Sequence, residues 1–250
     1  MAGNVLLVSS SAGKVYKMSG FSSTVTTSFA YASAYNVAWT GTDVIYANTS
    51  NGASIKKGTG FAATVQASFT SPQSGDVSYG ISYFSSNVYI VGGSSKVWKM
   101  TGFSATVNSS YSTGTDQRGV ANDENSNNVT NGDSTKVRLH SGFSSTVSNS
   151  FTGPAGANNG IAYDGTSYLK VKDDDVVFKV LKLTGFSSTI TTSFTHPAGN
   201  AGDGGGIFWD DFIAPPVTSA IKTFDGLAYA STKTVKGLAI ASVKTWNGLA

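Results

Sequence analysis

Carboxylate side chains are the reactive groups that stand at corresponding positions of this sequence. Glu124 is the only glutamate among the 250 residues; its neighbour Asp123, together with Asp164 and Asp210, follows segments that can be aligned with one another. A pair of carboxylates can act as acid and as base or nucleophile on a glycosidic bond, and several oxygen ligands can bind Ca²⁺. An aspartate at the start of a tight turn also accepts hydrogen bonds from backbone amides. Turn formation, a Ca²⁺ site and catalysis are therefore the three interpretations of these aspartates.

Other reactive residue types form no recognisable arrangement. The chain has no cysteine, and neither His140 nor His196 belongs to a paired-histidine zinc motif or a Ser-His-Asp motif. Asp173–Asp175 are adjacent, whereas Ca²⁺ loops usually place spacers and glycine between their ligands. The sequence GDGGG at 202–206 lacks the lysine of a phosphate-binding loop. We therefore predict no catalytic residue, no cofactor and no metal, with the three aspartates as weak metal candidates, and a protein that is not an enzyme.

The composition is typical of short strands joined by tight turns. Charged residues make up 12% of the chain, hydrophobic residues 40% and aromatic residues 12%, with 29 glycines. This hydrophobic content argues against disorder. A net charge of +3 without a basic run argues against nucleic-acid binding, and no apolar stretch approaches the ~20 residues of a membrane span. The first residues also lack the features of a signal peptide, so we expect no secretory signal and no membrane insertion.

One six-residue phrase is repeated along most of the chain. GFSSTV at 20–25 returns as GFAATV, GFSATV, GFSSTV and GFSSTI, with the Gly-Phe pairs at 20, 60, 102, 142 and 185. The steps of 40, 42, 40 and 43 residues match a propeller blade of four short strands. The period-2 alternation of the intervening segments, such as 36–48 and 160–172, predicts two hairpins in each unit. We label the four expected strands A to D in chain order.

The two ends of the repeated region predict how the ring closes. Residues 4–29 contain strands B, C and D with no strand A before them, and residues 204–212 contain a strand A with no strand B after it. Together they complete one blade, which leaves no unpaired seam in the ring. The sequence therefore predicts an all-β protein whose residues 1–213 form a five-bladed β-propeller with four-stranded blades.

Repeated glycine and aromatic residues have a structural and a functional interpretation. The glycine of each phrase is expected to adopt a positive φ in the C–D turn, and the following phenylalanine to fill space between blades. Aromatic residues also stand near the end of four A strands, where they could form the channel wall or stack on a glycan; Asn122 is the exception in the fifth. These possible glycan-binding residues are Trp39, Tyr83, Tyr163 and Trp209. The D–A and B–C loops differ most between units, so they are the alternative place for recognition.

The C-terminal segment has a second repeat, with a period of eleven residues. After the Pro-containing linker 214–220, residues 221–250 read IKTFDGLAYAS, TKTVKGLAIAS and VKTWNGLA. The Asp-Gly, Lys-Gly and Asn-Gly pairs favour turns between short strands over a helical supercoil. Three such units cannot bury their apolar side chains alone, so we expect them to bind sister subunits or another protein. The residues expected to make these contacts are Phe224, Leu227, Val235, Leu238, Trp246 and Leu249.

The KTxxGLAxAS units resemble the short NGLA-type repeats at the ends of structural proteins of tailed bacteriophages. The resemblance covers about 30 residues, and Asp225 and Lys236 replace the usual asparagine before glycine. It implies a virion component that is assembled in the host cytoplasm, with residues 221–250 contacting other virion proteins or copies of the same chain. The five-bladed ring resembles lectins of the tachylectin-2 type in architecture only.

These features predict a non-enzymatic virion structural protein, for decoration of the particle or for attachment to a host surface glycan. A lectin with sites between blades is the first alternative. A glycosidase that uses Asp123, Asp164 and Asp210 is the second.

Overall fold

The structure is a computed structural model. It describes residues 3–210 except 33, 49–53, 73–77, 94, 124, 126, 133–135, 155–156, 174–176 and 200–204, and in the C-terminal part residues 223–224, 227–228, 234–235 and 238–239. The chain divides into two compact units, Met1–Ala214 and Pro215–Ala250. The two units are described separately below.

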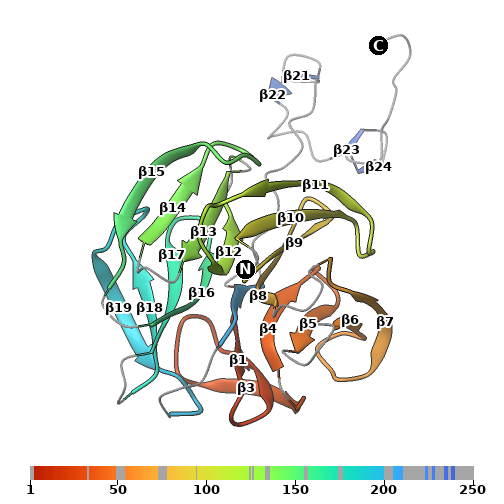
Figure 1. Cartoon of the computed structure of the whole chain (residues 1–250). Helices are drawn as coiled ribbons and strands as arrows, with labels where there is room; N and C mark the ends of the chain where they lie inside the picture. Colours follow the sequence, from red (N-terminus) through yellow and green to blue (C-terminus); the bar gives the residue numbers. More distant parts are fainter. Residues whose placement is uncertain are drawn as a thin grey trace. The chain divides into compact units, whose positions relative to one another are not determined.

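The first unit is a five-bladed β-propeller, as the sequence predicts (Figure 1). Each blade is an antiparallel sheet of four strands, and we number the blades along the chain from the one that contains the first strand. Blade 1 consists of β20 (Ile207–Trp209), β1 (Val5–Ser9), β2 (Lys14–Met18) and β3 (Val25–Ala30). Blade 2 consists of β4 (Ala34–Trp39), β5 (Val44–Asn48), β6 (Ser54–Gly58) and β7 (Val65–Thr70).

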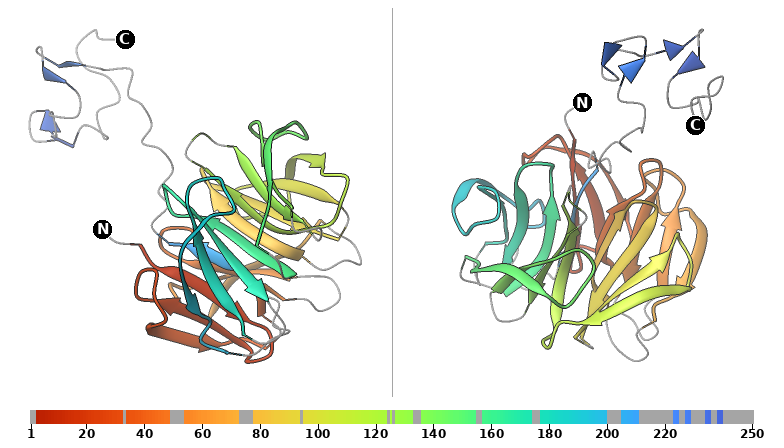
Figure 2. Two further views of the ribbon diagram at one scale, coloured as in Figure 1. Left: turned by 90° about the vertical axis from the view of Figure 1, so that its left-hand side faces the viewer. Right: turned by 90° about the horizontal axis from the view of Figure 1, so that it is seen from above.

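The remaining blades repeat the same order of strands. Blade 3 consists of β8 (Ser78–Phe84), β9 (Asn87–Gly92), β10 (Lys96–Thr101) and β11 (Val107–Ser112). Blade 4 consists of β12 (Gln117–Asn122), β13 (Asn128–Gly132), β14 (Lys136–His140) and β15 (Val147–Thr152). Blade 5 consists of β16 (Ala157–Tyr163), β17 (Tyr168–Asp173), β18 (Lys179–Leu183) and β19 (Ile190–Thr195). In each blade the first strand named lies innermost and the last lies at the rim (Figure 2).

Blade 1 joins segments from the two ends of the propeller. Strand β20 pairs antiparallel with β1, and the register places Trp209 opposite Val5 and Ile207 opposite Leu7. This pairing confirms the ring closure that the incomplete strand sets at residues 4–29 and 204–212 predict. It also removes the unpaired inner edge that a ring ending in a partial blade would have.

The repeated Gly-Phe phrase has the structural role that the sequence predicts. The φ angles of Gly20, Gly60, Gly102, Gly142 and Gly185 lie between 54° and 62°, a region that side chains with a Cβ rarely adopt. Each following phenylalanine packs edge-on against an aromatic ring of the outermost strand of the preceding blade. The centroid distances are 4.9 Å for Phe21–Phe194, 5.1 Å for Phe61–Phe29, 4.9 Å for Phe103–Phe69, 4.9 Å for Phe143–Tyr111 and 4.8 Å for Phe186–Phe151.

Small residues allow the innermost strands to approach one another around the axis. A Cβ at Gly80 would lie 2.8 Å from the Cα of Gly119, and a Cβ at Gly119 would lie 2.8 Å from the backbone nitrogen of Ile161. Contacts this short leave no room for a side chain. The core itself lies between the blades, where the middle strands contribute buried Val, Leu, Ile and Met residues.

The second unit contains short β-structure in the eleven-residue repeats. Strand β21 (Thr223–Phe224) pairs antiparallel with β22 (Leu227–Ala228), and β23 (Thr234–Val235) pairs with β24 (Leu238–Ala239). The strands agree with the extended conformation that the sequence favours over a helix. Within the described residues, no helix is long and apolar enough to cross a membrane.

Candidate functional site

Asp123 forms hydrogen bonds within its own turn after β12. Its Oδ1 accepts hydrogen bonds from the backbone amides of Asn125 at 2.9 Å and Asn127 at 2.8 Å. Its Oδ2 accepts a third from Nδ2 of Asn127 at 3.0 Å. The side chain of Asn127 in turn accepts a hydrogen bond from the backbone amide of Gly142 at 2.9 Å, which connects this turn to the Gly-Phe turn of the same blade. Asp123 therefore acts as a turn residue.

Asp164 combines a turn with an ion pair. Its Oδ1 accepts hydrogen bonds from the amides of Thr166 at 3.0 Å and Ser167 at 2.7 Å, and Nζ of Lys182 lies 2.6 Å from its Oδ2. Burial raises the pKa of Asp164, but the hydrogen bonds from Lys182, Ser167 and Thr166 outweigh that effect, so the pKa lies below its ordinary value. The carboxylate is held in its charged form, which suits an ion pair and not a general acid.

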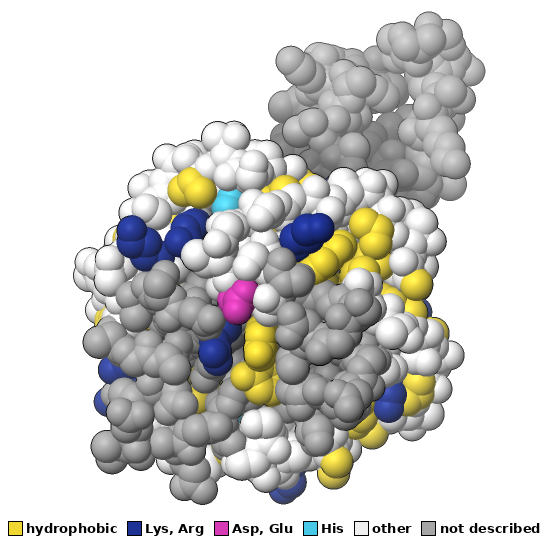
Figure 3. All heavy atoms as spheres, in the orientation of Figure 1, with side chains coloured by type: hydrophobic (Ala, Val, Ile, Leu, Met, Phe, Trp, Pro, Cys, Tyr) yellow, Lys and Arg dark blue, Asp and Glu magenta, His cyan; other side chains and the backbone are white. Residues whose placement is uncertain are grey.

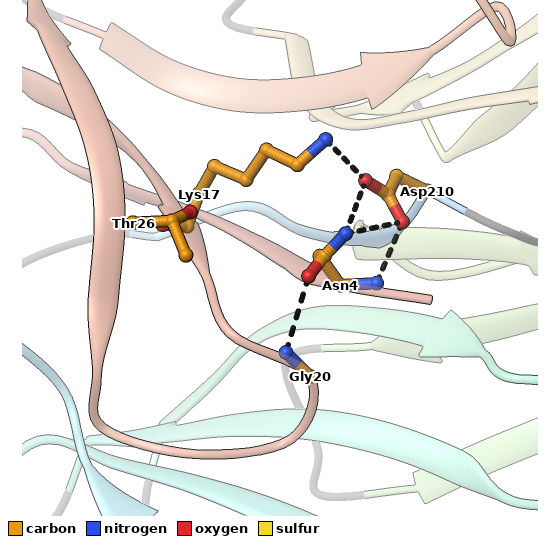
Figure 4. Close-up of polar contacts among 5 residues, drawn as sticks. All are labelled: Asn4, Lys17, Gly20, Thr26 and Asp210. Atoms are coloured by element: carbon orange, nitrogen blue, oxygen red, sulfur yellow. Dashed lines mark hydrogen bonds and ion pairs between the residues drawn. The ribbon is translucent and has the colours of Figure 1, made fainter. Parts of the chain in front are cut away.

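Asp210 links the two chain segments that close the ring (Figure 4). Its Oδ1 accepts a hydrogen bond from the backbone amide of Asn4 at 2.6 Å, and its Oδ2 accepts one from Asn4 Nδ2 at 3.0 Å and lies 2.7 Å from Nζ of Lys17. Asn4 also accepts a hydrogen bond from the amide of Gly20 at 3.2 Å. Asp210 thus takes the place of a covalent turn between β20 and β1.

The lysine that pairs with aspartate in blades 1 and 5 has other neighbours where the aspartate is absent. Blade 2 has Thr40 at the corresponding place, and Lys57 Nζ lies 5.8 Å from the centroid of the Phe103 ring in the next blade. In blade 3, Lys99 Nζ lies 6.0 Å from the ring centroid of Phe143. These distances are at the limit of a cation–π interaction. The repeated lysine therefore serves the packing of the scaffold in four blades.

The four aromatic residues proposed for glycan stacking lie in two environments. Trp39 and Tyr83 are partly buried and pack against the large core cluster of blades 1 to 3, and Lys17 Nζ lies 5.3 Å from the Trp39 ring centroid. Tyr163 and Trp209 instead line a cavity at the ends of the innermost strands. The structure therefore brings two of the four together at the axis.

The axial cavity is small and partly polar. Blades 1, 3, 4 and 5 line it with Ser82, Val120, Ala121, Asn122, Ile161, Ala162, Tyr163, Phe208 and Trp209. The centre of a water molecule can move within about 10 Å³ of it, which is room for about one water. Oγ of Ser82 donates a hydrogen bond to Oδ1 of Asn122 at 3.2 Å. Nδ2 of Asn122 has no partner among the described residues, although the side chain is buried.

Asn122 is the innermost member of a polar row that crosses blade 4. Its register partner on β13 is Asn128, and the partner of Asn128 on β14 is His140. All three are buried, and Nε2 of His140 lies 2.9 Å from Oγ1 of Thr130. Both amide atoms of Asn128 lack a hydrogen-bond partner within the described part of the chain. In blade 3 the same row consists of Tyr83, Val88 and Met100.

Burial and charge keep His140 neutral. Burial, and then the charge of Arg138, lower the pKa of His140 to about 4, although a hydrogen bond to the backbone of Ser144 opposes them. The Tyr111 ring of blade 3 lies 5.1 Å from the imidazole, measured between ring centroids. His140 therefore packs as a neutral side chain between blades 3 and 4.

The other candidate residues lie in the core or outside the described residues. His196 is buried, with its ring centroid 4.7 Å from that of Phe178. Glu124, Asp174, Asp175, Trp246 and Leu249 lie outside the described residues, and so do parts of the D–A loops, at 33, 73–77, 155–156 and 200–204. Of the other four tail residues, Phe224, Leu227, Val235 and Leu238, the structure describes the backbone, which belongs to β21 to β24. On the face shown in Figure 3, most of the visible charged side chains are Lys or Arg, and an acidic side chain lies near the centre.

Sequence reasoning singled out Asn122 as an exception among the aromatic residues but assigned it no role. It also missed Ser82 and Asn128. The signal was present in the alignment of the repeats: Asn128 stands where other blades have Val5, Val44 and Val88. A polar residue at a position that is apolar elsewhere in the same repeat marks either a defect of packing or a binding site.

Comparisons with known proteins show the fold alone. The chain matches no protein-family model and no curated protein sequence. A protein of unknown function from Bacteroides caccae is similar in structure, with a TM-score of 0.52 and 14% identity over 78% of this chain and 73% of that chain. The glutaminyl cyclase of Myxococcus xanthus has a TM-score of 0.56 and 10% identity over 66% and 72%. The WD40 domain of Neurospora crassa Pan2 has a TM-score of 0.47 and 12% identity over 64% and 49%.

Proposed function

We propose that the chain is a non-enzymatic structural protein of a virion, in which the propeller attaches to a host surface and residues 221–250 mediate assembly. The proposal that the protein is not an enzyme rests on one observation: each of the three aspartate carboxylates is held by neighbouring groups of the scaffold. Asp123 accepts hydrogen bonds from its own turn, Asp164 adds an ion pair with Lys182, and Asp210 holds the ring closed. A glycosidase needs two carboxylates that face one substrate and are free to exchange protons.

The eleven-residue repeats support the assembly role. Each of the two described hairpins pairs only two residues per strand. A hairpin of this length is not stable by itself in water. Contacts between several copies would bury the apolar residues of the repeats and stabilise these short strands. The resemblance of the repeats to phage structural proteins supports a particle as the place of this assembly.

The assembly role can be tested with the full chain and a variant that ends at residue 214. We expect the full chain to form oligomers in light-scattering measurements and the shortened chain to remain a folded monomer. A matched control replaces Lys222, Lys233 and Lys244 with serine, which removes charge but leaves the apolar residues of the repeats. This control should still form oligomers. The full chain is also expected among the proteins of purified virus particles in mass spectrometry.

Three results would overturn parts of the proposal. A monomeric full chain would remove the assembly role of the repeats, and unchanged oligomers in the shortened chain would assign assembly to the propeller instead. Hydrolysis of a polysaccharide that is lost in Asp164→Asn would contradict the non-enzymatic role.

A further inference from the structure

We infer that the axial cavity beside Asn122 binds the terminal residue of a neutral saccharide, with one hydroxyl group in the cavity and the sugar ring against Trp209, the lining aromatic residue that is only partly buried. The inference rests on the proposed attachment role and specifies its ligand site.

The cavity has the mixed lining of a site for a small organic group. Phe208, Trp209 and Tyr163 contribute aromatic surface, and Ser82 and Asn122 contribute the polar atoms. Binding sites commonly combine a largely apolar lining with a few placed polar groups. The described lining residues include no charged side chain; the carboxylates of Asp164 and Asp210 are paired with lysines, and that of Asp123 accepts hydrogen bonds from its own turn. The site therefore favours a neutral ligand.

Asn122 supplies a hydrogen-bond donor that no described residue uses. Its side chain is 3% exposed, its Oδ1 already accepts a hydrogen bond from Ser82, and its Nδ2 has no partner in the part of the chain that the structure describes. A buried amide donor without an acceptor is unfavourable, so an oxygen atom in the cavity would stabilise it. The hydroxyl oxygen of a ligand or of a water molecule has the required chemistry.

The position of Asn122 within the repeat explains why space is left beside blade 4. The corresponding residues of the other innermost strands are Trp39, Tyr83, Tyr163 and Trp209. An aromatic side chain at residue 122 would occupy far more volume than the amide. The replacement therefore leaves space beside two aromatic rings and places an unpaired amide donor on a residue that lines that space.

A saccharide residue matches both kinds of surface. The C–H bonds on one face of a pyranose ring pack on aromatic side chains, and its hydroxyl groups accept hydrogen bonds from amide donors. Because the cavity has room for about one water molecule, only one hydroxyl or hydroxymethyl group can enter it. We expect weak binding by one site, with a Kd on the order of 1 mM.

The test is saturation-transfer NMR of the full chain with the methyl glycosides of glucose, galactose, mannose and N-acetylglucosamine. At least one glycoside should bind to the unmodified chain. Asn122→Leu removes the donor at similar volume, and Asn122→Tyr restores the aromatic residue of the other blades and fills the cavity. We expect both variants to bind that glycoside at least tenfold more weakly.

Asn131→Leu is the matched control. Asn131 is equally buried in blade 4, and both its amide atoms lack a partner among the described residues, but it does not line the cavity. It should retain full binding. Thermal unfolding of each variant shows whether it is folded, and Asn122→Tyr covers the case in which Asn122→Leu does not fold.

The inference is wrong if none of the four glycosides binds to the unmodified chain, or if folded Asn122→Tyr binds as well as the unmodified chain. In the first case the occupant of the cavity is water. Loss of oligomers after removal of the repeats would still support the assembly role, so the two proposals fail separately.

Discussion

Blades 3 and 4 share an interface but differ in what they place inside it. At corresponding positions of three adjacent strands, blade 3 has Tyr83, Val88 and Met100, and blade 4 has Asn122, Asn128 and His140. The Gly-Phe turns of the two blades remain alike: Phe103 and Phe143 both pack at 4.9 Å on an aromatic ring of the preceding blade. The turns and rim contacts thus define a blade, while its interior can change from apolar to polar.

The comparison also shows where the polar groups of blade 4 are satisfied and where they are not. Thr130 Oγ1 and His140 Nε2 contact each other, whereas Nδ1 of His140 and atoms of Gln117, Asn122, Asn128, Asn131 and Arg138 lack hydrogen-bond partners within the described residues. Each such atom destabilises a folded protein by about 1–3 kcal/mol unless water or a ligand pairs with it. Blade 4 should therefore be the least stable of the five.

The largest effect is expected when the residues of the two blades are exchanged. Val88→Asn gives blade 3 the residue of blade 4; it replaces buried apolar surface with an unpaired amide and should lower the free energy of unfolding by about 3–4 kcal/mol. Asn128→Val is the reverse change and should raise it by about 1–3 kcal/mol. Urea unfolding measures both. Stabilisation by Val88→Asn, or destabilisation by Asn128→Val, would contradict the proposed difference between the blades.

The next effect is a pH dependence that belongs to blade 4. Because the pKa of His140 is lowered from 6.5 to about 4, the unfolded chain binds its proton more readily than the folded chain. The contribution of His140 to the free energy of unfolding is fully present above pH 6.5 and decreases as the pH falls towards 4. Below that pH the free energy of unfolding is lower by about 3 kcal/mol. His140→Met carries the residue found at Met100 and should lose this part of the pH dependence. The free energy of unfolding of both proteins is measured at several pH values. If it changes equally with pH in both, the pH dependence belongs to groups other than His140.

The smallest effect concerns the lysine that blade 4 lacks. Lys182→Leu gives blade 5 the residue found at Leu139 in blade 4 and removes the ion pair with Asp164. The turn amides of Thr166 and Ser167 still hold the carboxylate, so the free energy of unfolding should fall by only about 1 kcal/mol. The pKa of Asp164, followed by NMR, should rise. Lys182→Arg keeps the charge and serves as the control; a loss above about 3 kcal/mol in Lys182→Leu would show that the pair, not the turn, holds this aspartate.

Much of the fold is predictable because it depends on local patterns. The spacing of the Gly-Phe pairs gives the number of blades, and the incomplete strand sets around Val5 and Ile207 give the closure. Both depend on backbone conformation and strand pairing, and the sequence pattern that determines these occurs in each of the five units. The turn role of Asp164 was among the open interpretations for the same reason, since a turn depends on residues two and three positions away.

The cavity was not predictable in this way. Asn122, Ser82 and Trp209 belong to three blades, and their distances depend on how closely the innermost strands approach the axis. That approach depends on Gly80 and Gly119, whose role is visible only in the packed structure. The ion pair between Lys17 and Asp210 joins residues far apart in the sequence and likewise required the closed ring.

The pairing of β1 with β20 has a consequence for synthesis of the chain. Ile207, Phe208 and Trp209 are added about 200 residues after their partners Val5, Leu6 and Leu7. At ordinary translation rates the delay is roughly 10–40 s. During that time the inner edge of β1 is available to any other nascent strand, so this edge is where misassembly between neighbouring chains on one messenger RNA should begin.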